Sequence, residues 1–98
     1  MDQKKMSSSL CAVLLIFSAD AELRMKALPH VDIENESIDW DAIWNGCLGG
    51  GHTAAVVWAK AIWCDEVATK SDPFERAFAM GPQLQSKVLE ALRIRWSL

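Results

Sequence analysis

The spacing of apolar residues along the chain predicts helices over most of its length. Leu10, Val13 and Phe17 recur at helical intervals within a first predicted helix, residues 9–28. The first half of this segment is apolar on every side, which is typical of a helix with neighbours on several faces. Pro29 prevents the helix from continuing.

A second helix is predicted over residues 39–48, because its apolar residues form a clean stripe at intervals of three and four. The stripe consists of Trp40, Ile43, Trp44, Cys47 and Leu48. Three glycines, Gly49, Gly50 and Gly51, are expected to end this helix, since glycine loses much backbone entropy inside one. Gly46 offers an earlier end.

The third predicted helix covers residues 53–70, with Thr53 as its cap. Its apolar residues fall on two opposed sides. Val56 and Trp63 share one side, whereas Trp58 and Ile62 point to the other. This distribution predicts that one apolar face is left over after the core is formed.

Two shorter segments complete the helical pattern. In the helix predicted at residues 73–80, Asp72 caps, Pro73 suits the first position and Glu75 completes a capping box. The last helix is predicted at residues 83–96. Its apolar face comprises Leu84, Val88, Leu89, Leu92 and Trp96.

The segment between the first two helices is the least regular. Residues 29–36 alternate apolar and acidic side chains, which is a strand signal, but a single short strand has no partner in this pattern. We therefore expect an extended loop. The 98 residues then predict an all-α fold, a compact single-domain bundle of four to five helices.

Composition supports a folded chain with a substantial core. Hydrophobic residues make up 51% of the sequence, and there are five tryptophans. We expect Trp44, Trp63 and Trp96 in the core. The net charge of −3 and the lack of a basic helical face argue against nucleic acid as a partner.

The cysteines and the N-terminal segment bear on the compartment. Three cysteines without short-range pairing favour free thiols in the cytoplasm. The apolar run of residues 10–17 is much shorter than the roughly 20 residues that cross a bilayer, so no membrane partner is expected. Ala19-Asp20-Ala21 has a small-x-small form, which leaves secretion after cleavage near Ala21 as the alternative.

A glycine loop at residues 49–53 is the main chemical candidate. Gly49, Gly50, Gly51, His52 and Thr53 precede a helix, where backbone N–H groups can hold an anion. The preceding strand and the lysine of a phosphate loop are missing, so a tight turn between helices is the favoured interpretation. A small-molecule or anion binder is the alternative function.

Catalysis and metal binding have little support in the sequence. Cys47 and His52 could pair, but Cys47 lies on an apolar stripe, where a buried and inert thiol is expected. Neither Cys47, His52 nor Cys64 shows the spacing of zinc ligands. We therefore expect no enzyme activity, no metal and no cofactor.

The surfaces left over predict a protein-interaction role. Trp58 and Ile62 are the first candidates for an interface, most simply that of a two-fold homodimer, and Trp40 is the second. Asp32, Glu34 and Glu36 belong to an acidic segment, residues 32–41, which either docks a basic partner or is an ordinary solvated surface.

The expected function is therefore a non-catalytic, small helical interaction protein whose partner is a protein, itself included. In size and in its lack of catalytic signatures, the chain resembles small accessory proteins of phages and mobile elements, including inhibitors of bacterial defence such as anti-CRISPR proteins. This resemblance is one of size class only, and it implies nothing about particular residues.

Overall fold

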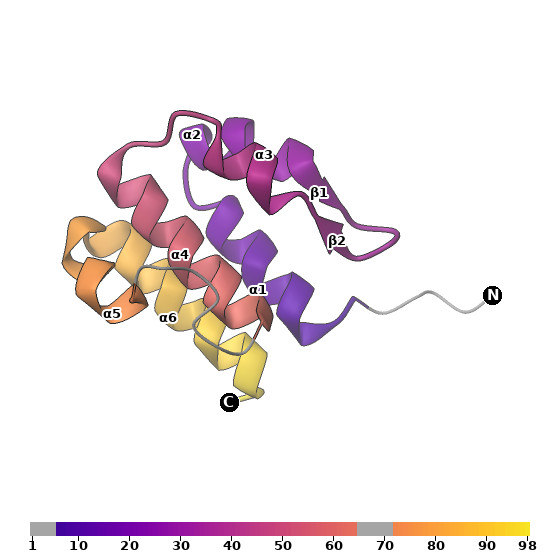
Figure 1. Cartoon of the computed structure of the whole chain (residues 1–98). Helices are drawn as coiled ribbons and strands as arrows, with labels where there is room; N and C mark the ends of the chain where they lie inside the picture. Colours follow the sequence, from indigo (N-terminus) through magenta and orange to yellow (C-terminus); the bar gives the residue numbers. More distant parts are fainter. Residues whose placement is uncertain (1–5, 65–71) are drawn as a thin grey trace.

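Three helices that contact one another form the centre of the fold. The structure is a computed structural model, and it describes residues 6–64 and 72–98. The central helices are α1 (Ser8–Phe17), α4 (Gly50–Cys64) and α6 (Pro82–Trp96), and each packs against the other two (Figure 1). The radius of gyration, 12.7 Å, is that of a compact chain of this length.

Smaller elements cover two parts of this trio. The helix α2, the 3₁₀ helix η1, a two-stranded hairpin and α3 lie together on one side, and α5 with the 3₁₀ helix η2 packs on α4 (Figure 1). Their bounds are α2 Ala21–Lys26, η1 Leu28–His30, β1 Val31–Asp32, β2 Ser37–Ile38, α3 Trp40–Trp44, α5 Pro73–Arg76 and η2 Ala77–Ala79. The described residues are therefore mostly helical, as predicted, with one small sheet besides.

The sheet corrects the prediction of an extended loop at residues 29–36. Val31 pairs with Ile38 and Asp32 with Ser37 in an antiparallel ladder. The missing partner strand is thus the next few residues of the chain. Asp32 fixes the turn, because its carboxylate accepts the backbone N–H of Asn35 at 3.1 Å and the Asn35 side-chain amide at 2.7 Å.

The first predicted helix, residues 9–28, is two helices in the structure. α1 ends at Phe17, and Asp20 adopts an extended backbone and caps α2 by accepting the Leu23 N–H at 2.9 Å. The Gln83 side chain of α6 donates to the Ala19 carbonyl at 3.3 Å, which satisfies one backbone group in the break. Asp20 was the capping signal inside an otherwise periodic segment.

α1 contributes much of the core. Val13, Ile16 and Phe17 are fully buried and belong to one cluster with residues of α4 and α6. Cleavage near Ala21 would remove this helix from between its two neighbours. Removal of α1 would therefore expose the core residues of α4 and α6 that it covers.

Several helix boundaries also differ from the predicted ones. α3 is shorter than residues 39–48, with Asp39 accepting the Ala42 N–H at 3.1 Å and the helix ending at Trp44. α4 begins at Gly50, so Thr53 is not its cap. The predicted end of that helix, residue 70, lies outside the described residues.

The capping signal at Asp72 is confirmed, since its carboxylate accepts the Phe74 N–H at 2.9 Å. The short helix that follows tightens into η2 after Arg76, whereas a single helix at residues 73–80 was predicted. α6, predicted at residues 83–96, starts one residue earlier at Pro82.

The buried face of α6 agrees with the predicted one at Leu84 and Val88 but not at Leu89 and Trp96. Leu84, Val88 and Ala91 face the core, whereas Leu89 is 63% and Trp96 is 58% exposed. Ala91, which the predicted face left out, is fully buried, and Leu92 is half-buried against the core.

None of the helices in residues 6–64 and 72–98 is both long enough and apolar enough to cross a bilayer.

Candidate functional site

The structure buries the two residues that the sequence placed first at an interface. Trp58 is 9% exposed and Ile62 is 4% exposed, and both belong to the core cluster. Their expected exposure is therefore wrong. α4 packs against α1 and α6 and also against α5 and η2, so its second apolar face is covered by the chain itself.

Trp40, the second candidate, also packs inward. Its indole makes an edge-to-face contact with Phe17, with ring centroids 6.0 Å apart, and the Lys60 ammonium lies 5.8 Å from its centroid. The side chain is half-buried against the core. Trp44 and Trp63 are likewise half-buried there, whereas Trp96, predicted in the core, is largely exposed.

Two acidic residues of the segment 32–41, Asp32 and Glu36, make hydrogen bonds within the fold. Asp32 holds the hairpin turn, and the hydrogen bonds from Asn35 keep the pKa of the Asp32 carboxyl below its usual value. Glu36 adopts a left-handed backbone and accepts the hydroxyl of Ser7, the residue that caps α1, at 2.6 Å. Glu34 is exposed near the hairpin tip. Docking of a basic partner at this segment stays a prediction.

The glycine loop presents a histidine that is clamped between two carboxylates. The His52 Nε2 lies 2.6 Å from an Asp20 oxygen, and its Nδ1 contacts a Glu22 oxygen. Lys26 extends this chain, lying 3.0 Å from Glu22 and donating to the Cys47 carbonyl at 2.9 Å. The cluster ties α2 to the start of α4.

This arrangement opposes anion binding at residues 49–53. Both ring nitrogens of His52 face carboxylates, so an incoming anion would meet two negative charges. A neutral imidazole carries one N–H, and only the protonated ring can donate to Asp20 and Glu22 at once. The loop is the start of α4 and is held to α2 by the contacts of His52 with two carboxylates, and anion binding there stays a prediction.

Metal binding and nucleophilic catalysis gain no support from the described residues. Asp20 and Glu22 approach opposite edges of the imidazole, so they do not converge on one cation, and no metal-ligating group of three is found in residues 6–64 and 72–98. Cys47 is exposed rather than buried on the predicted stripe, because α3 ends before it and its backbone is left-handed.

The clamp gives the first testable prediction. Burial disfavours the Asp20 carboxylate, but the Leu23 N–H and His52 outweigh this and hold its pKa below the usual value. A lowered folded-state pKa stabilises the fold above the ordinary aspartate pKa of about 3.9, and this stability is lost as pH falls through the folded value. We expect wild type to lose more stability in acid than Asp20→Asn, which retains a capping oxygen.

Urea denaturation at pH 6 and at successively lower pH measures this difference. Asp39→Asn is the matched control, since Asp39 caps α3 in the same way without a histidine contact, and it should follow the wild-type pH dependence. Equal acid sensitivity of wild type and Asp20→Asn would show that the clamp does not contribute.

An open apolar hollow, not anticipated from the sequence, lies where α4, α5, η2 and α6 meet. It has a volume of about 220 Å³, and Trp58 of α4, Phe74 of α5, and Leu89 and Leu92 of α6 line it. We call it the Trp58 hollow. Phe74 stands edge-on to Trp58, with ring centroids 4.9 Å apart. Gln85 also lines the hollow, and its amide donates to the Ala77 carbonyl at 2.8 Å.

Two phenylalanines on the segment beside this hollow are largely exposed. Phe74 is 74% exposed, and Phe78, next to the lining residue Ala77, is 92% exposed. We call the Trp58 hollow together with Phe74, Phe78 and Leu89 the α5–α6 face. The sequence feature that could have indicated this face is the pair Phe74 and Phe78, two large apolar residues in a segment too short to bury both of them.

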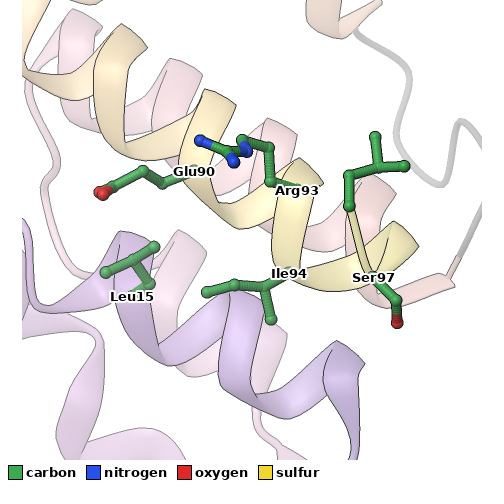
Figure 2. A pocket seen from close by; sticks show the side chains of 6 residues that line it. Leu15, Glu90, Arg93, Ile94 and Ser97 are labelled. Carbon is green, nitrogen blue, oxygen red and sulfur yellow. The ribbon is translucent and has the colours of Figure 1, made fainter.

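Two further hollows are less suited to recognition. The one between α1 and the end of α6 has a volume of about 340 Å³, and Figure 2 shows Leu15 of α1 facing Ile94 of α6, with Arg93 beside Ile94 and Glu90 one turn earlier on α6. The one at the hairpin tip is lined by Met6 and residues 33–36. Both carry ionisable side chains in their lining, so an apolar ligand would have to desolvate charge there.

Comparison with known proteins adds no assignment. Searches against family models, curated proteins and solved structures each gave no match to this chain.

Proposed function

We propose that this chain is a non-catalytic protein-interaction module that binds its partner through the α5–α6 face. The observation that carries the proposal is an apolar hollow lined by the exposed side chains of Phe74 and Leu89, with the exposed Phe78 next in the chain to the lining residue Ala77. Contiguous exposed apolar surface of this kind is costly for an isolated chain and typical of binding sites. Aromatic anchors beside a pocket are also the usual centre of a protein interface.

Other features of the molecule support a protein partner. The lining is mainly apolar and carries no charged side chain among the described residues, so the hollow suits an apolar side chain better than a charged metabolite. All three cysteines are free thiols, which supports a reducing compartment such as the cytoplasm. A role as a phage or mobile-element accessory protein or inhibitor of bacterial defence is in keeping with this mode of action.

Affinity capture with matched variants tests the proposal. Leu89→Ser removes an exposed apolar group from the α5–α6 face, and Met25→Ser does the same on α2, where Met25 is 76% exposed. We expect the wild type and Met25→Ser to retain the same protein from the native cell, and Leu89→Ser to lose it at equal folded concentration.

Two outcomes of this capture experiment would contradict the proposal. If Leu89→Ser retains that protein as well as the wild type does, binding does not use the α5–α6 face. If Met25→Ser loses it as well, the loss follows from surface apolarity in general and not from this face.

A further inference from the structure

The α5–α6 face combines a protruding aromatic ring and an apolar recess side by side. Phe78 is 92% exposed and follows directly on Ala77, whose side chain belongs to the lining of the Trp58 hollow. It also lies four residues after Phe74, another lining residue, about one helical turn along the α5–η2 segment. Knob and recess are therefore close together along the α5–η2 segment.

We propose that the occupant of the Trp58 hollow is Phe78 from a second copy of this chain. In a two-fold dimer the same patch meets itself, so each residue i that contacts residue j is matched by j contacting i. A two-fold axis passing between Phe78 and the hollow places each copy's ring in the other copy's recess. This inference rests on the proposed function, and it identifies the partner that binds the α5–α6 face as a second copy of the chain.

The size and chemistry of the recess fit one aromatic ring. Its volume of about 220 Å³ is enough for a phenyl group, and the ring would meet Trp58 and Phe74, which already form an edge-to-face pair. A third ring can extend that pair by the same quadrupole interaction. The described lining residues carry no charge, so a partner with a charged tip would lose hydration without gaining an ion pair.

The exposed aromatic side chains supply part of the area that a dimer needs. Phe74 is 74% and Phe78 is 92% exposed, and aromatic side chains bury about 150–250 Å² each. The two rings therefore offer on the order of 300 Å², more than a third of the roughly 800 Å² that each partner contributes to a standard interface. Leu89, with Leu92 and Trp96 beyond it on the same stripe of α6, extends the surface.

Sedimentation velocity with the full chain tests the dimer, from micromolar concentration up to about 1 mM. We expect a reversible dimer for the wild type and for Met25→Ser. Phe78→Ser should raise the dissociation constant by at least about 100-fold, because two symmetric contacts are lost at once. Phe78 is almost fully exposed, so its replacement leaves the monomer fold intact, which an unchanged circular dichroism spectrum and melting temperature verify.

A mixing experiment separates the knob-in-recess contact from general stickiness. Phe78→Ser lacks the knob and keeps the recess, whereas Leu89→Trp keeps the knob and obstructs the recess. Each variant alone should be monomeric. An equimolar mixture should form a heterodimer, because one Phe78 can still enter one open recess.

The outcomes separate this inference from the proposed function. A wild type that remains monomeric up to about 1 mM overturns self-association, and so does a Phe78→Ser variant that dimerises like the wild type. Neither result touches the proposed function, which falls only if Leu89→Ser still captures the cellular partner. A mixture without heterodimer shows that Phe78 does not occupy the Trp58 hollow.

Discussion

Replacing Trp58 by alanine is expected to lower the free energy of unfolding by about 3–5 kcal/mol, as large aromatic truncations in cores do. The indole is 9% exposed and lies in the cluster that joins α4 to its neighbours, and it also supports Phe74. Trp63→Ala should cost less, because Trp63 is half-buried at the edge of the same cluster.

A conservative replacement shows which part of the indole matters. Within the described residues, the Trp58 N–H is buried without a hydrogen-bond partner. Trp58→Phe removes this unsatisfied donor and keeps most of the ring, so we expect it to be far milder than Trp58→Ala. Chemical denaturation of the three variants decides this, and Trp63→Ala proving more destabilising than Trp58→Ala would contradict the packing described for α4.

The second large effect is expected at a glycine. A Cβ at Gly51 would lie 2.9 Å from the Ala79 backbone carbonyl oxygen of η2, which cannot yield without moving the backbone. Gly51→Ala should therefore destabilise the fold by about 1–3 kcal/mol, in the range of overpacked sites. The close approach of α4 to η2 is the reason for a glycine at this position.

The neighbouring glycine is the matched control. A Cβ at Gly50 would meet nothing within 4 Å, and alanine is the better helix former, so Gly50→Ala should leave stability unchanged or raise it by up to about 1 kcal/mol. Thermal melting of the two variants gives the comparison. Opposite signs are expected, and a stabilised Gly51→Ala would show that η2 does not approach α4 so closely.

Helical periodicity predicted most of the elements but not their interruptions. The pattern of residues 9–28 runs through Ala19, and only the cap formed by Asp20 shows that two helices meet there. Similarly, the alternation at residues 29–36 indicated a strand, but its partner, Ser37–Ile38, was too short to recognise without the turn geometry of Asp32 and Asn35.

The candidate surface was the least predictable part, because it depends on tertiary packing. Trp58 and Ile62 were expected at the surface on the assumption that α4 has one buried side, and α5 with η2 covers the other. Covering Trp58 leaves Phe74 and Phe78 outside in its place. The amount of apolar surface was thus visible in the sequence, but its position depended on which helix covers which.

The contacts of His52 with Asp20 and Glu22 also depend on tertiary packing and could not be predicted from the sequence. Nothing in the sequence pairs His52 with Asp20 and Glu22, thirty or more positions away. The glycines before His52 suggested an anion site. The packing of α2 against the start of α4 instead places the carboxylates of Asp20 and Glu22 there. Charge patterns along a chain predict surfaces well only when the fold keeps those segments apart.

Methyl NMR during a concentration series tests the central claim most directly, because it reports which surface is covered on association. The claim predicts that the methyl signals of Leu89 and Leu92, in the Trp58 hollow, shift progressively as the protein concentration rises. Those of Met25 on α2 and of Ile33 at the hairpin, 76% and 51% exposed, should stay in place. Shifts at Met25 or Ile33 with unchanged Leu89 and Leu92 signals would contradict the claim and assign association to another face.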